Sequence, residues 1–367
     1  MAYFKCPKTS SGGGGDTAIY GAEWAGTSDP AWTRTDDAVG LADPNPYYVG
    51  MTGDPSSPFD NIMPWSGMEA VEDTEAGTLV KIPKFYYKWT RNDPAMKLQI
   101  SMTKHEGFLC SPAHADRGDG AGERDYVYVG KYHCAASTYK SSSGVLPQAS
   151  QTRAAFRSAI SALGTSIWQW DYAMLWTIRM LYLIEFAHWN SQLKIGYGCG
   201  NNSAAENNGL TDTFAYHTGT NTSSRSAYGH VKYRHIEGLW DNVRDFVDGI
   251  VFSSTNVLCI KNPAEFSDTT GGVTVGTRWT GSSGNDIKSW TNPSANGFEY
   301  ALYPASIGSD SAYATYVCDR VYGSSPSVVL NVGGSYGQSQ YCGLFYSCGN
   351  SVSYSNAYVG SRLQKLP

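Results

Sequence analysis

The chain has 367 residues, of which 41% are hydrophobic, so it is long enough to bury a sizeable core in one large or two ordinary domains. Only 16% of the residues are charged, whereas tyrosine (26), tryptophan (11) and glycine (40) are abundant. Polar aromatic side chains therefore replace charges on much of the expected surface. The net charge is −5 and no block of lysine and arginine is present, which argues against a nucleic-acid partner.

Two stretches argue against a secretion signal and against membrane insertion. The first seven residues (MAYFKCP) lead into serine and glycine before an apolar run of signal-peptide length can form. The apolar stretch 173–187 is interrupted by Arg179 and Glu185 and is too short to span a bilayer, which favours a buried helix. The eight cysteines are scattered without a Cys-x-x-Cys pair, as in proteins made in a reducing cytoplasm.

Turn-forming residues dominate the first part of the chain, and strand patterns begin near residue 78. Residues 1–75 hold many Gly, Pro, Ser and Asp residues and only short apolar runs, which predicts an irregular or short-stranded leader or attachment module. Residues 76–367 are expected to form the main domain. Alternating or apolar runs predict strands at 78–82, 85–89, 98–102, 125–132, 250–253, 257–260 and 328–332.

Two helices are expected between these strands. Residues 152–163 place Phe156, Ile160 and Leu163 on one face, and Gly164 is a suitable left-handed terminator. Asp171 stands where an N-cap belongs, ahead of an apolar run that predicts a largely buried helix. The sequence therefore predicts an α+β fold with two helices against mostly antiparallel short strands.

No motif for catalysis, metal binding or cofactor binding is apparent. The glycine run 12–15 lacks the Gly-Lys-Ser/Thr of a phosphate-binding loop and is interpreted as a linker. His230 and His235 lack a third ligand nearby, so no metal site is expected. No paired carboxylates stand in a context that argues for acid/base chemistry. We therefore expect neither a metal nor a cofactor, and a binding protein rather than an enzyme.

The segment Gly333–Arg362 has the composition of a binding surface. Of its thirty residues, five are Tyr, seven Ser, six Gly and two Asn, and Arg362 is the only charged residue. These four types are favoured in antibody paratopes, where tyrosine gives rigid contact area and the small polar residues adapt hydrogen bonds. A flexible Gly/Ser-rich tail is the alternative. Interspersed apolar residues such as Leu344, Phe345 and Val359 favour a folded segment.

Three motifs stand out at the end of the chain: GGSY at 333–336, GLFY at 343–346 and SYSNAYVGSRL at 353–363. They resemble the variable region of diversity-generating retroelement target proteins, a group that includes phage tail receptor-binding proteins. Upstream, YRHIEGLWDNVRDFVDG at 233–249 resembles the core motif of the formylglycine-generating-enzyme type of C-type lectin fold. The runs IPKFYYK at 82–88, VGKY at 129–132 and LIEFAHWNSQ at 183–192 resemble related gut-phage proteins.

The resemblance implies a C-type lectin-like domain at 76–367 with a variable region at 333–362. In that group, reverse transcription miscopies template adenines, so Asn codons become codons for residues such as Tyr, Ser, Gly or Asp without creating stops. The implied varied, ligand-binding positions are Ser335, Tyr336, Gly337, Ser339, Tyr341, Tyr346, Ser347, Asn350, Tyr354, Asn356 and Tyr358. The implied fixed frame is Gly333, Gly334, Leu344, Phe345, Val359, Gly360 and Arg362.

A scaffold tolerates such variation only where side chains point outward from a fixed backbone. We therefore expect the tyrosines of this segment to be exposed, and Leu344, Phe345 and Val359 to be buried. The resemblance implies a phage-tail or prophage location in the virion, and a bacterial surface protein or glycan as receptor. It also suggests a homotrimer, in which several copies would multiply weak contacts.

Two alternatives remain open at this point. The scaffold motif is shared with the formylglycine-generating enzyme, so an oxidase using Cys342 and Cys348 is conceivable, although the segment offers only Arg362 to activate a thiol. A calcium-dependent sugar lectin is the other alternative, but the Glu-Pro-Asn or Gln-Pro-Asp triplet of such lectins is missing. Calcium-independent binding is therefore favoured.

Overall fold

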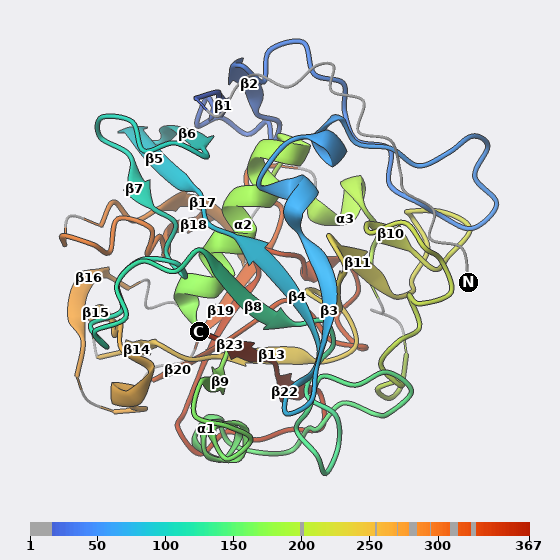
Figure 1. Cartoon of the computed structure of the whole chain (residues 1–367), viewed down its shortest axis with the longest axis vertical. Helices are drawn as coiled ribbons and strands as arrows, with labels where there is room; N and C mark the ends of the chain where they lie inside the picture. The colour runs from blue at the N-terminus through green and yellow to red at the C-terminus, as the bar shows by residue number, and fades with distance from the viewer. Residues whose placement is uncertain are drawn as a thin grey trace, which may run out of the picture.

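The computed structural model describes residues 17–198, 202–253, 255–269, 271–278, 285–293, 295–308, 315–323 and 328–367. The glycine run 12–15 lies outside these ranges. The described chain is an α+β fold in which short strands greatly outnumber helices (Figure 1). The α+β class predicted from the sequence is therefore confirmed.

Two five-stranded sheets join the N-terminal region to the rest of the chain. The first has the order β2 (Thr33–Asp36), β1 (Ile19–Trp24), β6 (Ala95–Ser101), β5 (Tyr86–Asn92), β7 (Leu109–Cys110). The second has the order β3 (Glu69–Asp73), β4 (Gly77–Pro83), β8 (Tyr126–Gly130), β23 (Leu363–Lys365), β9 (Ile167–Gln169). The β3–β4 hairpin crosses the expected boundary at residue 75, and β1 pairs with β6. Residues 17–75 therefore share sheets with the later chain.

A seven-stranded sheet collects strands from the C-terminal part of the chain. Its order is β18 (Pro304–Gly308), β17 (Asn285–Trp290), β19 (Arg320–Gly323), β21 (Ser347–Asn350), β20 (Val329–Val332), β13 (Arg244–Val247), β22 (Val359–Ser361). Two of its pairings, β19 with β21 and β13 with β22, are parallel. The strands on either side of the segment 333–358 are therefore held in one sheet.

Two three-stranded sheets complete the fold. One has the order β10 (Gly219–Thr220), β11 (Val231–Tyr233), β12 (Ile236–Glu237), and the other β14 (Ile250–Phe252), β15 (Asn256–Cys259), β16 (Val273–Thr277). The strands predicted from alternation correspond to β4, β5, β6 and β8, and those predicted from apolar runs correspond to β14, β15 and β20. These seven predictions are confirmed.

Helix α2 (Tyr172–Phe186) is the central helix and all of its residues are buried. The Asp171 side chain accepts a hydrogen bond from the Met174 N–H at 2.9 Å, so the predicted N-cap is confirmed. The helix ends where Ala187 adopts a left-handed conformation with φ of 47°. In Figure 1 it passes behind β4 and β8, and it packs against β1 and β6. A short third helix, α3 (Ser191–Lys194), follows it.

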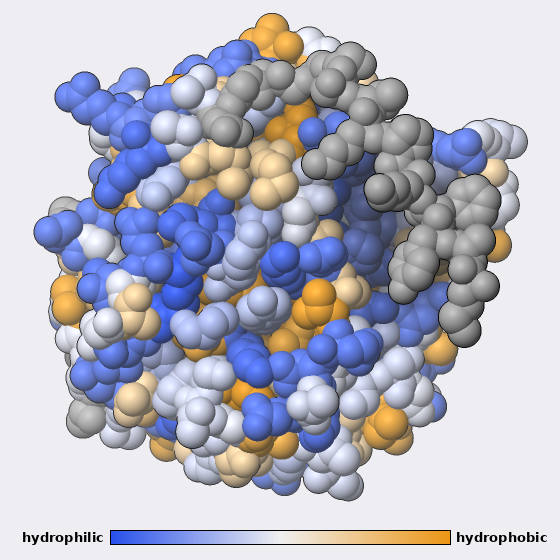
Figure 2. All heavy atoms as spheres, in the orientation of Figure 1, coloured by the Kyte–Doolittle hydropathy of each residue, from blue (hydrophilic) through white to orange (hydrophobic). Residues whose placement is uncertain are grey.

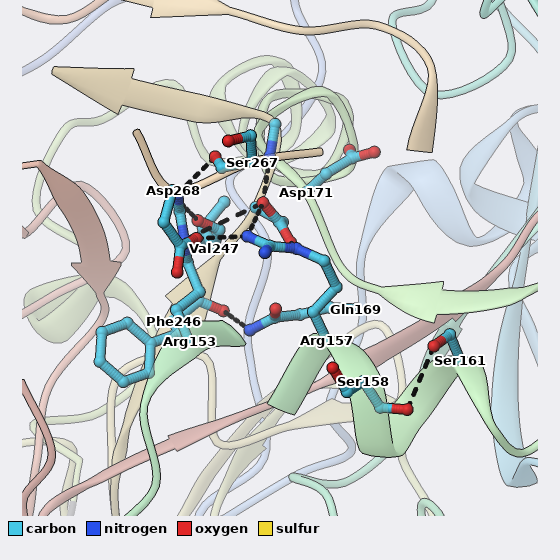
Figure 3. Close-up of polar contacts among 12 residues, drawn as sticks. Arg153, Arg157, Ser158, Ser161, Gln169, Asp171, Phe246, Val247, Ser267 and Asp268 are labelled. Carbon is cyan, nitrogen blue, oxygen red and sulfur yellow. Dashed lines mark hydrogen bonds and ion pairs between the residues drawn. The ribbon is translucent and has the colours of Figure 1, made fainter. Parts of the chain in front are cut away.

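Helix α1 (Arg153–Ser161) has an amphipathic sequence and is anchored by its arginines. Thr152 is its N-cap, but the helix ends at Ser161 with Ala162 as C-cap, so the expected terminator at Gly164 is wrong. Figure 3 shows Arg153 reaching from α1 towards Val247 and Asp268. Its guanidinium donates to the Val247 carbonyl at 3.0 Å and to Asp268 at 2.9 Å. Arg157 also binds Asp268, so two ion pairs fasten α1 to the segment that follows β15.

The face shown in Figure 2 is mixed in character. Hydrophobic residues occur there in small separate groups among hydrophilic ones, and no broad apolar patch covers β3, β4 and β8. Among the described residues, no helix is long and apolar enough to cross a membrane.

Candidate ligand-binding surface

The segment 333–362 is a folded part of the domain and alternates between buried and surface stretches. It leaves β20 at Gly333, forms a short 3-10 turn at Ser339–Tyr341, and returns through β21 into the seven-stranded sheet. A loop at 351–358 then leads to β22. The alternative of a flexible Gly/Ser-rich tail does not fit this course, because both returns are strands paired within the sheet.

Glycines are required at the start of the segment because neighbouring backbone and side chains approach closely. Gly333 has φ of 83°, and a Cβ there would collide with the Leu239 carbonyl oxygen. A Cβ on Gly334 would collide with the Cys342 side chain. A larger residue at either position would therefore be strained by its conformation or by its neighbours. These contacts support the expectation that both glycines belong to the frame.

The apolar frame residues are buried as predicted. Leu344 is 1% exposed, and Phe345 and Val359 are fully buried. The Phe345 N–H donates to the Asp319 carboxylate at 2.7 Å, and the Leu344 carbonyl accepts from Arg179 Nε at 3.0 Å. Burial raises the pKa of Asp319 well above its usual range. These bonds fix the backbone between the 3-10 turn and β21 against buried scaffold groups.

Arg362 anchors the other end of the segment and is fully buried. Its guanidinium donates to the carbonyl oxygens of Gly130 at 2.7 Å, Lys131 at 3.0 Å and Glu237 at 2.6 Å. Its Nε lies 3.3 Å from the Asp245 carboxylate. The side chain therefore joins β8 to the ends of β12 and β13, which is a structural role inside the frame.

The expected ligand-binding positions fall into two groups. Gly337 is exposed, and seven others are half-buried at the surface: Tyr336, Ser339, Tyr341, Asn350, Tyr354, Asn356 and Tyr358. Ser335 (3% exposed), Tyr346 (0%) and Ser347 (1%) are buried, so the expectation that they point outward is wrong. The other four tyrosines of the segment are half-buried rather than exposed as expected. Ser347 begins β21 and Tyr346 directly precedes it; this strand lies inside the sheet between β19 and β20, and this position hides both side chains.

The half-buried tyrosines are held against the protein while part of each residue stays accessible to solvent. Tyr354 and Tyr358 pack against a small core cluster that includes Val359, and their hydroxyl groups lie 2.6 Å apart. The Tyr336 backbone N–H donates to the Asn242 carbonyl at 2.9 Å, which fixes the main chain of that residue. The Ser339 hydroxyl lies 2.7 Å from the Tyr228 hydroxyl outside the segment. Rigid aromatic rings with adaptable hydroxyl groups suit a contact surface.

Sequence reasoning missed Arg244, which lies among these residues. The Arg244 cluster consists of Arg244, Gln338, Tyr346, Cys348 and Tyr358. The guanidinium carbon lies 5.3 Å from the Tyr346 ring centre and 5.0 Å from the Tyr358 ring centre. Its Nε donates to Gln338 Oε1 at 2.7 Å. Because β13 pairs in parallel with β22, this arginine is brought beside a segment more than ninety residues later, and no local pattern reveals it.

The two cysteines of the segment are buried free thiols with different surroundings. Cys342 Sγ lies 3.1 Å from the Ser339 carbonyl oxygen, whereas Cys348 Sγ accepts from Arg244 at 3.8 Å. Burial raises the pKa of the Cys342 thiol well above its ordinary value. A reactive cysteine needs a thiolate, which this environment disfavours.

The described residues contain no group of three or more His, Cys, Asp or Glu side chains arranged to hold a metal ion. His230 lies 3.0 Å from the Glu206 carboxylate, and burial lowers the pKa of His235 to about 3. Both histidines are therefore accounted for by packing and hydrogen bonding. No protein-family model matches the chain, and no curated protein matches it.

Proposed function

We propose that this chain is a ligand-binding protein that recognises its partner through the surface formed by residues 336–358. The observation that carries the proposal is the division of one short segment into a buried frame and a polar aromatic face. Leu344, Phe345, Val359 and Arg362 are buried and bonded to the scaffold, while eight of the eleven expected contact positions reach the surface. Such a backbone can present different side chains without refolding.

The resemblance in the sequence extends this proposal to diversification. We infer a variable protein of a diversity-generating retroelement, with a C-type lectin-like domain of the formylglycine-generating-enzyme type. In this proposal the protein belongs to a phage or prophage tail, acts as a homotrimer, and recognises a bacterial surface protein or glycan. Several tethered copies would raise weak single-site affinity to useful avidity. We do not propose the oxidase alternative, because burial raises the pKa of Cys342 and opposes thiolate chemistry there.

Sequencing of codons 333–362 from many copies of the gene in one population tests diversification. We expect substitutions at adenine-containing template positions, concentrated at residues 336, 337, 339, 341, 350, 354, 356 and 358. Residues 333, 334, 343–347, 359, 360 and 362 should stay constant. An even spread of substitutions over buried and surface positions would contradict the proposal, as would the absence of a nearby template copy and reverse transcriptase gene.

Binding itself is tested with purified, fluorescently labelled protein on cells of bacteria from the same source. A variant carrying Tyr336→Ser, Tyr354→Ser and Tyr358→Ser should lose binding because the aromatic contact area is removed. Tyr126→Ser is the matched control, since Tyr126 is 43% exposed on β8, outside the segment. Equal binding by both variants would show that the surface is not the binding site.

A further inference from the structure

Arg244 differs from the residues around it because it belongs to the scaffold. It begins β13 and pairs with Val359, the first residue of β22. Its backbone N–H also donates to the Tyr358 carbonyl at 3.0 Å. The position lies outside the segment 333–362, so an arginine is present here whatever residues occupy the varied positions.

The contacts of Arg244 leave part of its guanidinium unused. Nε donates to Gln338, and Nη1 makes only a long contact of 3.8 Å to the Cys348 sulfur. Nη2 makes no hydrogen bond to any residue in the described part of the chain, and it is not among the enclosed nitrogen atoms that lack a partner. The side chain as a whole is half-buried. One edge of the guanidinium therefore remains available from the surface.

The charge of Arg244 is also uncompensated within the described ranges. It forms no ion pair there, and residues 333–361 contain no acidic side chain. Burial lowers its pKa, but the neighbouring Tyr346 and Cys348 outweigh this effect, so the pKa of Arg244 lies above its ordinary value. A half-buried cation between two aromatic rings attracts an anionic group more strongly than a fully solvated one does.

We propose that Arg244 is a fixed anchor for the carboxylate group of an acidic carbohydrate, an inference that rests on the proposed function of this surface. The planar guanidinium can donate two parallel hydrogen bonds to the two oxygens of a carboxylate. A carboxylate carries one negative charge, which a single cation balances, whereas a phosphate monoester carries about two.

The surroundings favour a carbohydrate over a protein partner. Serine and tyrosine hydroxyls and the Gln338 and Asn350 amides offer hydrogen bonds to sugar hydroxyls. The fully buried core of a protein interface is more apolar than the rest of a protein surface. The exposed large aliphatic side chains of the described ranges all lie outside residues 335–358, namely Val39, Val49, Met63, Val145, Leu146, Leu193 and Val273. Hydroxyl-rich contacts around one cation therefore suit a uronate- or sialate-type residue.

An oligosaccharide array tests this inference with the full chain. It carries uronate- and sialate-terminated oligosaccharides, their methyl esters, neutral oligosaccharides and acidic peptides. We expect binding to one or more free acids and at least about tenfold weaker binding to the matching esters, because the ester removes the charge-assisted hydrogen bonds. Equal binding of acid and ester would overturn the inference, as would no binding to any acidic sugar. Binding to acidic peptides alone would overturn the carbohydrate assignment.

Variants locate the anchor. Arg244→Gln should weaken binding of the free acid about ten- to hundredfold. Arg244→Lys should retain part of the affinity, because lysine keeps the positive charge but lacks the paired N–H donors of the guanidinium. Lys81→Gln is the matched control, since the Lys81 ammonium also lies over a tyrosine ring, that of Tyr126, outside this surface. Unchanged affinity in Arg244→Gln would refute the role of Arg244. If the triple tyrosine variant still loses cell binding in that case, only this inference fails and the proposed function stands.

Discussion

The buried position of Tyr346 makes a sharp prediction about which tyrosines of the segment can be replaced. Tyr346 is fully buried, and its ring lies 5.8 Å from the Tyr322 ring and 5.3 Å from the Arg244 guanidinium carbon. Replacing a buried aromatic side chain by a small one removes its transfer free energy and leaves a cavity, at a cost of about 3–5 kcal/mol. We therefore expect Tyr346→Ser to lower the free energy of unfolding by about 3–4 kcal/mol.

Tyr336→Ser is the matched control in the same segment. Tyr336 is half-buried and its ring makes no aromatic contact with the described residues. We expect this variant to lose less than about 1 kcal/mol. Denaturant titration at neutral pH, followed by tryptophan fluorescence, measures both free energies of unfolding. Losses that agree within about 1 kcal/mol would refute the division between frame and surface on which the proposed function depends.

Three further predictions use the same titration. Arg362→Met should cost about 3–5 kcal/mol, because three backbone carbonyls and a carboxylate lose a buried donor; a loss below about 1 kcal/mol would contradict the anchoring role. Burial lowers the pKa of His114 from 6.5 to about 4. As the pH falls from 6.5 to 4, the histidine is therefore protonated in the unfolded chain before it is protonated in the folded one. The free energy of unfolding should fall by about 3 kcal/mol over this range. His114→Gln should show a flatter pH profile between these values, and an unchanged profile would exclude this histidine as the cause. Gly343→Ala should cost about 1–3 kcal/mol because its Cβ would collide with the Asp319 carboxylate. Gly337→Ala should cost less than about 1 kcal/mol because a Cβ there lies in open space. Equal losses in the two variants would contradict the assignment of Gly343 to the frame and Gly337 to the surface.

Local patterns predicted the elements whose surroundings are simple. Strict alternation at 98–102 marks β6, because one side of that strand faces the core. Asp171 predicted the start of α2, because an N-cap is a local hydrogen bond. The end of α1 was mispredicted, since Ala162 serves as C-cap in an ordinary right-handed conformation and no glycine is needed there.

The sequence indicated which segment forms the candidate surface, but it showed only some of the residues that are buried or exposed there. The apolar spacing of Leu344, Phe345 and Val359 correctly indicated buried anchors. Tyrosine suits both cores and surfaces, so its identity alone did not show that Tyr346 is buried directly before an interior strand. Arg244 depends on a parallel pairing between distant strands, which a single sequence does not reveal. Long-range pairing, rather than local propensity, therefore decides which residues meet at this surface.

The position of β23 has a consequence for the inheritance of variation. This strand lies between β8 and β9 and pairs with both, and it comes directly after the segment 333–362. A copy that lost its reading frame within that segment would also lose β22 and β23, leaving two sheets without a member strand. If the segment varies as proposed, gene copies that alter only its surface side chains would still yield folded protein, whereas frameshifted copies would not. Under the proposed function, the fold would thereby separate surface substitutions from frameshifts before any ligand is bound.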